Sequence, residues 1–403
     1  MHSNERGTQV AEVSKRMCVV FGAGALGLGF LGPELGEAYR MVYADIPQKG
    51  DLLESLSRLG EYCFNETGPA ARAVAVEGVS GLCVSDSRAV AEALEGADLV
   101  FTAVGEANLA KVAPALGAAA SARSTKRPLR VLCSENGLEI AVKLRSHINE
   151  SLGEDPGARL LVGDTVMGRM CQIVSPPRPG MEPVCAGLDW AVSAEPFFGI
   201  PLERRVLEGM DSPPPALQPM GKAEFAARED VKMWAHNGVH AFLAYLGELR
   251  GRTYFFELGG EVLSMASKMQ REEVGAALLR KHGAALDRNF WHNYAPTILR
   301  RIICPGLRDT IARGTRGPMR KLDPLERLVS GVRGIAQQGI VPTLYATGLA
   351  AAVIVAQRQG ETPLEFREVL TEHCGLKAHD ERKLIRLVLE QLDWLVKEFE
   401  PGQ

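Results

Sequence analysis

Several features that would assign this chain of 403 residues to a specialised class are scarce or missing. The 46 lysines and arginines do not outnumber the 49 acidic residues, so we expect no broad basic surface and no nucleic-acid partner. The longest apolar run, residues 349–356, is far shorter than the roughly 20 residues that cross a bilayer, and it predicts a buried helix. The polar residues 1–16 do not resemble a signal peptide, so we expect a cytoplasmic protein without a membrane partner.

Paired metal-binding or redox motifs are missing as well. None of the eight cysteines belongs to a C-x-x-C pair, and the chain has no H-E-x-x-H sequence. In a reducing cytoplasm, scattered cysteines are typical of free thiols. The composition therefore disfavours both a disulfide scaffold and a cysteine-rich zinc cluster.

What the first half does contain is an alternation of short apolar runs and helical patterns. We expect residues 17–21, 41–44, 99–104 and 129–133 to be buried strands, and the alanine-rich residues 113–122 to be a helix. This alternation predicts an α/β fold with a doubly wound, mostly parallel sheet. Residues 73–76 and 82–85, which flank a glycine-containing segment, suggest a β-hairpin set into that scheme.

The second half has a different pattern. After proline-rich segments at 175–180 and 213–215, the residues beyond Met220 are patterned almost entirely as helices. We therefore predict an α/β domain over residues 1–210 and a mainly α-helical domain over residues 211–403. The boundary itself is expected within residues 205–220.

A glycine-rich string directly follows the first expected strand. It reads Gly22-Ala23-Gly24-Ala25-Leu26-Gly27, which is G-x-G-x-x-G at the start of a helix. In a dinucleotide-binding site the first glycine permits a tight turn, the second lets a pyrophosphate approach the backbone, and the third packs the helix on the strand. Alone, the string also fits an ordinary glycine-rich turn.

Asp45 strengthens the dinucleotide interpretation. It ends the apolar run 41–44, where an acid is placed to accept hydrogen bonds from an adenosine ribose and to repel a 2′-phosphate. Thr102 and Val104 close another strand and suit a loop beside a cofactor. We therefore predict a Rossmann-type domain that binds NAD in preference to NADP.

The most informative stretch, residues 229–240, predicts a buried helix because it is apolar nearly all round. At about 100° per residue, Asn237 lies about 140° and His240 about 80° around the helix from Lys232, so the three side chains share one sector. A buried lysine with a lowered pKa can take a hydroxyl proton, and amide donors can hold the oxygen. We predict that Lys232 is a general base.

Other interpretations of this helix remain open. Lys232 could instead extend its ammonium to solvent along the protein surface. His236 and His240 are spaced i, i+4 and could bind a metal, but no third ligand stands at a supporting spacing, so we expect no metal. Glu229 is either a proton relay to solvent or a plain surface acid.

The spacing Lys232-x4-Asn237-x2-His240 resembles the signature of the polyol-specific long-chain dehydrogenases, the mannitol dehydrogenase family. The glycine-rich residues 21–32 and the pair Glu135-Asn136 resemble further motifs of that family, in the same order. The resemblance implies a metal-independent, NAD-dependent oxidoreductase in which Asn136 and Asn237 hold the reacting oxygen. It also implies that His240 hydrogen-bonds and orients that oxygen.

One segment distinguishes members within the family. It reads Arg316-Gly317-Pro318-Met319-Arg320-Lys321-Leu322 and resembles the R-x-P-x-R-K-L of mannitol-1-phosphate 5-dehydrogenases. The resemblance implies a phosphorylated substrate, whose phosphate Arg316, Arg320 and Lys321 could clamp through charge-assisted hydrogen bonds. A solvated basic run is the alternative.

Two family motifs are altered. Gly168 replaces the second aspartate of D-[ST]-A-V-D-R-I, and Cys304 replaces the asparagine of R-F-x-N-P. Because the lysine, both asparagines and the histidine are retained, we still expect interconversion of mannitol 1-phosphate and fructose 6-phosphate, by a monomer or small homo-oligomer. The alternatives are a dehydrogenase of an unphosphorylated polyol or uronate, and a dinucleotide-binding sensor without activity.

Overall fold

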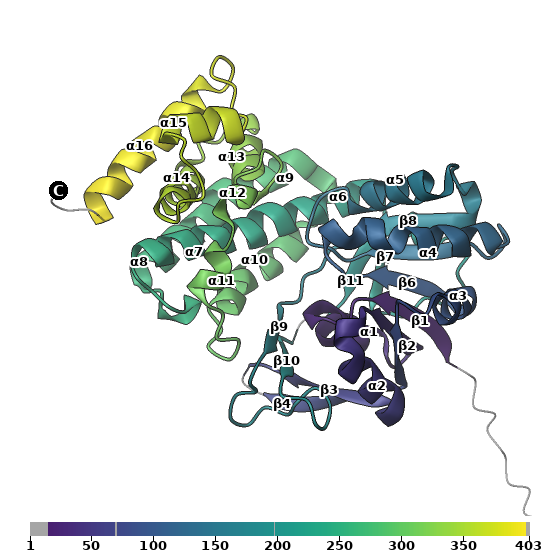
Figure 1. Cartoon of the computed structure of the whole chain (residues 1–403). Coiled ribbons are helices and arrows are strands. Elements are labelled where there is room, and N and C mark those ends of the chain that lie inside the picture. Colours follow the sequence, from purple (N-terminus) through teal and green to yellow (C-terminus); the bar gives the residue numbers. More distant parts are fainter. Residues whose placement is uncertain (1–14, 69–70, 197, 400–403) are drawn as a thin grey trace, which may run out of the picture.

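The computed structural model describes residues 15–68, 71–196 and 198–399, so most of the polar segment 1–16 lies outside the described residues. The first half is built on a six-stranded parallel sheet of order β5-β2-β1-β6-β7-β8 (Figure 1). Its strands are β1 (Arg16–Phe21), β2 (Tyr39–Asp45), β5 (Val79–Cys83), β6 (Leu99–Thr102), β7 (Leu129–Cys133) and β8 (Leu160–Asp164). This is the strand order of doubly wound dinucleotide-binding domains, in which the order reverses between β1 and β6. The four predicted strands are confirmed.

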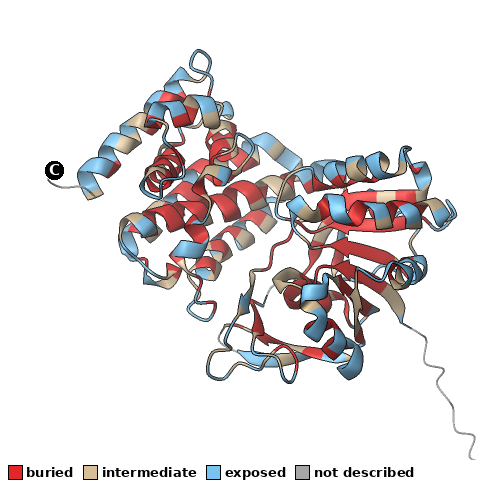
Figure 2. Ribbon diagram, in the orientation of Figure 1, coloured by how far each residue is buried: buried red, intermediate tan, exposed pale blue. Residues whose placement is uncertain are grey.

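The sheet is buried on both faces because its strands alternate their side chains between two cores. Val19 and Phe21 belong to the core under α3, α4 and α5, whereas Cys18 and Val20 belong to the core that contains α2. Figure 2 shows the buried strands between helices whose outer faces are exposed. The helices are α1 (Gly32–Leu35), α2 (Gly50–Leu59), α3 (Ser87–Gly96), α4 (Leu109–Ala122) and α5 (Ile140–Leu152). The helix predicted at 113–122 is confirmed as part of α4.

A second sheet, of order β4-β3-β10-β9, shares the core that contains α2. It consists of β3 (Glu61–Glu66), β4 (Arg72–Glu77), β9 (Cys171–Val174) and β10 (Ala191–Ala194). The predicted hairpin is wrong, because β4 pairs antiparallel with β3 whereas β5 pairs parallel with β2. The packing of Gly81 gives the physical reason: a Cβ there would overlap the backbone of Leu53, so this part of β5 fits directly under α2.

The second half is helical, as predicted, and lies beside the α/β half (Figure 1). Its helices are α6 (Lys222–Asp230), α7 (Gly238–Leu249), α8 (Gly260–Lys268), α9 (Ala276–His282), α10 (Arg288–Ile302), α11 (Ile311–Thr315), α12 (Pro318–Lys321), α13 (Arg327–Gln337), α14 (Thr343–Arg358), α15 (Phe366–Glu368) and α16 (Arg382–Phe399). Within the described residues, four segments are π-helical: Gly27–Leu31, Val231–Asn237, Met269–Gly275 and Val369–His373. α7 and α14 are almost fully buried in a separate core, and α14 contains the apolar run 349–356, which confirms the buried helix.

A small parallel sheet of β11 (Ile200–Glu203) and β12 (Leu217–Met220) connects the two halves. Leu217 still packs in a core of the first half, whereas Ala227 of α6 packs in the core of the second. The division at residue 210 stays a prediction. From the change of core we propose to place it after β12.

No helix within residues 15–68, 71–196 and 198–399 combines the length and the apolar character that a bilayer span requires. All eight cysteines lie in the described part of the chain and are free thiols, as the sequence predicted. Burial raises the pKa of the Cys171 thiol to about 12, so this thiol is uncharged at neutral pH.

Candidate active site

The glycine-rich string forms a tight loop after β1. Gly22 has a φ of 110°, and a Cβ there would overlap the carbonyl oxygen of Ala103, so the turn requires glycine. A Cβ at Gly27 would overlap the carbonyl oxygen of Gly22. A Cβ at Gly24, by contrast, would meet no atom within 4 Å, which leaves the backbone open to a ligand. The loop therefore has the shape that a bound pyrophosphate needs.

Asp45 lies at the end of β2, beside this loop. Its carboxylate accepts hydrogen bonds from the backbone N–H groups of Ala23 at 2.7 Å and of Ile46 at 2.8 Å. These contacts fix the carboxylate and leave further lone pairs free to accept hydrogen bonds. The predicted contact with a ribose is compatible with this position and stays a prediction.

Glu135 connects two neighbouring strand ends, a role that sequence reasoning missed. Its carboxylate accepts hydrogen bonds from Oγ1 of Thr102 at 2.7 Å and from the backbone N–H of Val104 at 3.1 Å. Burial raises the pKa of Glu135, and these hydrogen bonds oppose that effect. The Thr102 side chain is fully buried and supports Glu135, so we no longer expect it to face a cofactor, whereas Val104 is half-buried.

The helix that carries Lys232 and Asn237 is not the α-helix that we predicted. Residues 231–237 are π-helical, and the N–H of Gly238 donates to the carbonyl oxygen of Met233, five residues earlier. Because a π-helix has more residues per turn than an α-helix, the angle between Lys232 and Asn237 is smaller than the roughly 140° that we predicted. The local π-helix thus aligns the two predicted catalytic side chains better than an α-helix would.

Tyr345 of α14 contacts this π-helical turn. Its hydroxyl lies 3.2 Å from the carbonyl oxygen of Trp234 and 2.8 Å from that of Arg327, and it can donate to either. A Cβ at Gly238 would overlap the hydroxyl, so the glycine permits this close approach. A buried tertiary contact therefore accompanies the departure from α-helical geometry.

The structure brings Asn136 and Asn237 together from the two halves of the chain. Nδ2 of Asn237 donates to Oδ1 of Asn136 at 3.2 Å. Both residues and Lys232 line a cavity of about 40 Å³, and Lys232 also lines an adjacent cavity of about 270 Å³. The smaller cavity has room for only a few water molecules, so the adjacent larger cavity offers most of the space beside Lys232.

Lys232 is half-buried, and its side chain makes no hydrogen bond or ion pair with any residue that the structure describes. Burial is the main influence that lowers the pKa of Lys232, Arg301 adds to this effect and Glu195 opposes it, which leaves the pKa at about 7. An amine with this pKa can accept or release a proton near neutral pH. Glu229 lines the same small cavity, and burial raises its pKa to about 7, so it is not a plain surface acid.

His240 has a partner that sequence reasoning missed. Its Nε2 lies 3.1 Å from Oδ2 of Asp309, and its ring packs against Phe255 with 4.4 Å between the ring centroids. Burial lowers the pKa of His240 to about 4, although Asp309 opposes this, so the imidazole is neutral at neutral pH. When Nε2–H donates to Asp309, Nδ1 is left as a hydrogen-bond acceptor.

Asp309 is itself buried and is held from two sides. Arg313 donates to it through Nε at 2.5 Å and also through Nη2. Burial alone would raise the pKa of Asp309, but the hydrogen bonds from His240 and Arg313 hold it well below its ordinary value. Asp309 precedes α11 and does not lie on a helical turn, so helical spacing in the sequence could not have shown its contacts.

His236, the second histidine of the metal alternative, is buried, and its Nδ1 has no hydrogen-bond partner in the described part of the chain. Burial lowers the pKa of His236, so this side chain is also neutral. Among residues 15–68, 71–196 and 198–399, no group of three or more histidine, cysteine, aspartate or glutamate side chains is placed to bind a metal ion.

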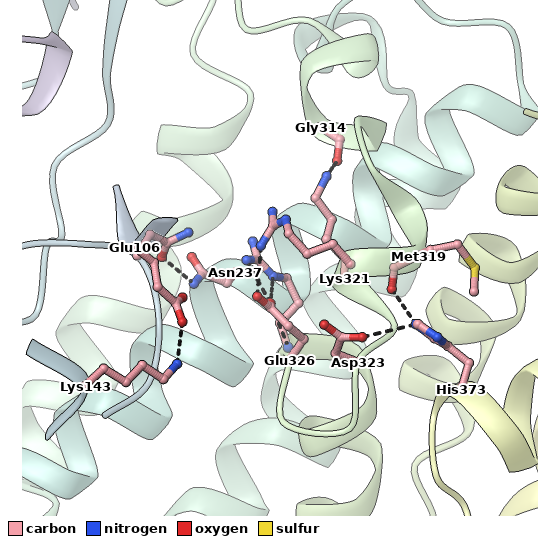
Figure 3. Close-up of polar contacts among 12 residues, drawn as sticks. Glu106, Lys143, Asn237, Gly314, Met319, Lys321, Asp323, Glu326 and His373 are labelled. Atoms are coloured by element: carbon pink, nitrogen blue, oxygen red, sulfur yellow. Dashed lines mark hydrogen bonds and ion pairs between the residues drawn. The ribbon is translucent and has the colours of Figure 1, made fainter. Parts of the chain in front are cut away.

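The structure does not assemble Arg316, Arg320 and Lys321 into one open clamp. Arg316 is exposed, and Nη1 of Arg320 donates to Oε1 of Glu326 at 3.0 Å. The Lys321 side chain is buried and donates to the carbonyl oxygen of Gly314, toward which it points in Figure 3. Burial lowers the pKa of Lys321 to about 7. The phosphate contacts of these residues stay a prediction.

Two family models and several curated proteins match most of the chain. The mannitol dehydrogenase Rossmann domain matches residues 16–204, and the mannitol dehydrogenase C-terminal domain matches residues 225–395. A mannitol-1-phosphate 5-dehydrogenase of Geobacillus thermodenitrificans is 32% identical over 371 residues, which cover 89% of this chain and 91% of that protein. A mannitol-1-phosphate 5-dehydrogenase of Caldanaerobacter subterraneus is 27% identical over 393 residues, which cover 94% and 96%.

Two solved structures are similar in fold. A D-sorbitol dehydrogenase in substrate-free form has a TM-score of 0.73 at 15% identity, and the match covers 96% of this chain and 94% of that chain. Pseudomonas fluorescens mannitol 2-dehydrogenase, in a ternary complex with NAD and D-mannitol, has a TM-score of 0.67 at 14% identity, with 96% and 95% covered. The predicted fold class, a Rossmann-type domain followed by a helical domain, is thereby confirmed. On the family models and the sequence relatives together, this chain belongs to the mannitol dehydrogenase family.

Proposed function

We propose that this chain is an NAD-dependent dehydrogenase that interconverts mannitol 1-phosphate and fructose 6-phosphate. The observation that supports it most is the shared cavity of Lys232, Asn136 and Asn237, where a lysine of lowered pKa faces two joined amides. The names of the two similar dehydrogenases, which match over most of the chain, support the choice of substrate.

The glycine-rich loop fits the dinucleotide. The open space at Gly24 and the tight turn at Gly22 suit a pyrophosphate that approaches the backbone of residues 22–27. Asp45 would accept hydrogen bonds from the adenosine ribose, and its charge would repel the additional phosphate of NADP. When bound, the nicotinamide accepts the hydride from the substrate carbon, or returns it in reduction.

Lys232 transfers the proton in this proposal. Because its pKa is about 7, its neutral form is available near neutral pH to take the proton of the C5 hydroxyl. In the reverse direction the ammonium returns that proton to the oxygen as the carbonyl is reduced. Nδ2 of Asn237 has two hydrogens, so one can hold Asn136 while the other donates to the substrate oxygen as it becomes negative.

His240 orients the substrate without changing charge. Asp309 accepts from Nε2–H, which fixes the tautomer and the orientation of the ring beside the reacting oxygen, whose single proton is directed at Lys232. Because burial keeps the imidazole neutral, it does not compete with the lysine for that proton. We therefore propose that His240 orients the reacting oxygen and takes no part in the proton transfer.

The phosphate of the substrate is assigned to Arg316, Arg320 and Lys321. Arg316 is exposed, and a phosphate dianion can compete with the carboxylate of Glu326 for Arg320. The engagement of Arg320 by Glu326 and of Lys321 by Gly314 is also the observation that favours a second candidate function. In that case the substrate is an unphosphorylated polyol or uronate.

The test is NADH oxidation by the purified protein with fructose 6-phosphate and, in parallel, with fructose. The proposal expects kcat/KM to be at least about 10-fold higher for the phosphate, as one charge-assisted hydrogen bond would provide. Equal or higher kcat/KM with fructose would favour the second candidate. NADH binding without turnover of either sugar would favour a sensor and contradict the proposal.

A further inference from the structure

The two altered family motifs meet where the halves of the chain join. Arg301 of α10 belongs to the motif in which Cys304 replaces asparagine, and its Nη2 donates to the carbonyl oxygen of Gly168. Gly168 is the residue that replaces the second aspartate of the other motif.

Glu195 supplies a carboxylate at the same place from a different strand end. It follows β10 directly, and it accepts from Nε of Arg301 at 2.9 Å and from Nη2 at 2.5 Å, one contact to each carboxylate oxygen. Glu195 is 3% exposed and also accepts the backbone N–H of Met170 at 2.7 Å. This two-point contact links the second sheet of the α/β half to a helix of the other half.

The pair is connected through Gly168 to a cavity of the proposed acid–base lysine. Gly168, which Arg301 contacts, and Lys232 line the same cavity of about 270 Å³. α10 also packs against the π-helical residues 231–237. After burial, Arg301 is the largest influence that lowers the pKa of Lys232, and Glu195 acts in the opposite direction.

We propose that Glu195 and Arg301 are positioning residues that act on Lys232 from across the junction of the two halves. Glu195 fixes the guanidinium, Arg301 favours the neutral amine that oxidation needs, and Glu195 favours the ammonium that reduction needs. This inference rests on the proposed function, in which Lys232 transfers the proton.

Other titratable groups also surround Lys232 or line its cavities. They are Glu135 after β7, Arg327 of α13, Cys171 of β9, Tyr294 of α10, Arg228 and Glu229 of α6, and His236 of its own helix. Arg327 acts in the same direction as Arg301 but less strongly, and the Cys171 thiol is uncharged at neutral pH. Single substitutions of Glu195 and Arg301 leave all of these groups in place, so they isolate the pair.

The first measurement determines the pKa of Lys232 without any turnover. Only the neutral amine reacts with trace acetic anhydride, so labelling of the Lys232 peptide at a series of pH values, read by mass spectrometry, gives its midpoint. We expect Glu195→Gln to lower the midpoint by about one pH unit and Arg301→Gln to raise it by about one pH unit. Arg300→Gln, an exposed position on the same helix, is the matched control and should leave the midpoint unchanged.

The second measurement is the pH dependence of kcat/KM for fructose 6-phosphate reduction. Reduction needs the ammonium, so activity falls as pH rises through the midpoint of Lys232. That falling limb should move to lower pH in Glu195→Gln and to higher pH in Arg301→Gln. Arg301→Lys keeps the positive charge, so its falling limb should lie at the same pH as that of the wild type. This variant can also be compared with Glu195→Gln if Arg301→Gln does not fold.

The outcomes separate this inference from the proposed function. Labelling midpoints that move in the same direction in the two variants, or that do not move, would overturn the role of the pair. Opposite shifts in a protein that turns over neither fructose 6-phosphate nor mannitol 1-phosphate would support the pair and contradict the proposed function instead.

Discussion

Nδ2 of Asn237 donates a hydrogen bond to Oδ1 of Asn136 across 3.2 Å, and this contact joins the loop after β7 to the π-helical turn that carries Lys232. The two amides come from different halves of the chain, so neither half contains the complete site. The glycine-rich loop belongs to the first half and the lysine to the second. The chemistry that we propose therefore depends on how the halves meet.

The π-helical turn can be tested through its contact with Tyr345. Gly238→Ala should lower the free energy of unfolding by about 1–3 kcal/mol, because the added methyl overlaps the Tyr345 hydroxyl in a packed core. Denaturant titration followed by circular dichroism measures the change. Tyr345→Phe, introduced into the Gly238→Ala protein, removes the overlapping oxygen and should recover part of the loss. A double variant no more stable than Gly238→Ala would show that this contact is not the cause.

Asp45 should determine the choice of cofactor. Asp45→Ala is expected to weaken NADH binding by roughly 10-fold or more, because hydrogen bonds from the ribose to a charged acceptor are lost. The preference for NADH over NADPH should narrow at the same time. Asp45→Asn is the matched variant: it can still accept from the N–H of Ala23 but no longer repels a phosphate. Parallel fluorescence titrations with NADH and NADPH measure both affinities. If the ratio of the two affinities is the same in the variants as in the wild type, Asp45 does not belong to the cofactor site.

The strands of the first half were predictable because burial on both faces leaves continuous apolar runs, such as residues 129–133 of β7. Which strands pair with one another was harder to predict from the sequence. Residues 73–76 and 82–85 flank a turn and suggested a hairpin, but β5 instead adds to the parallel sheet under α2. The fit of Gly81 against Leu53 decides this, and that contact exists only after the helix has packed.

The residue types of the site were predictable from spacing, but their geometry was not. The π-helical turn at residues 231–237 contacts Tyr345, which is distant in the sequence. The contacts of His240 with Asp309 and of Arg301 with Glu195 also join remote segments. A helical wheel contains no information about such tertiary contacts, so it could not show that residues 231–237 are π-helical.

Asp309 should act on catalysis through His240. Asp309→Asn is expected to lower kcat for fructose 6-phosphate reduction by roughly 10-fold or more, because an amide no longer fixes the tautomer in which Nε2 carries the proton. NADH affinity should change little. In a His240→Ala background the same substitution should cost almost nothing further, which steady-state kinetics of the four proteins would show. Full additivity of the two losses would mean that Asp309 acts independently of His240.

Arg320 carries the prediction about the phosphate. Arg320→Ala should lower kcat/KM for fructose 6-phosphate by about 10- to 150-fold, because a charge-assisted hydrogen bond contributes roughly 1.5–3 kcal/mol. The slower reaction with fructose should be almost unaffected, since fructose has no phosphate. Glu326→Gln removes the competing carboxylate and should lower KM for the phosphate. Equal losses of kcat/KM with fructose 6-phosphate and with fructose would mean that Arg320 has a structural role. If kcat/KM fell with neither sugar, Arg320 would not bind the phosphate.

The most direct test of the account is the pH-dependent rate of NADH oxidation with fructose 6-phosphate, measured for the wild type and Lys232→Ala. The wild-type rate should be highest below pH 7 and should fall as pH rises through the pKa of Lys232 at about 7, because reduction consumes the ammonium form. Lys232→Ala should lose roughly 100-fold or more in kcat, should lack this fall, and should still bind NADH. A folded Lys232→Ala protein that keeps a kcat near the wild-type value and the same pH dependence would contradict the account.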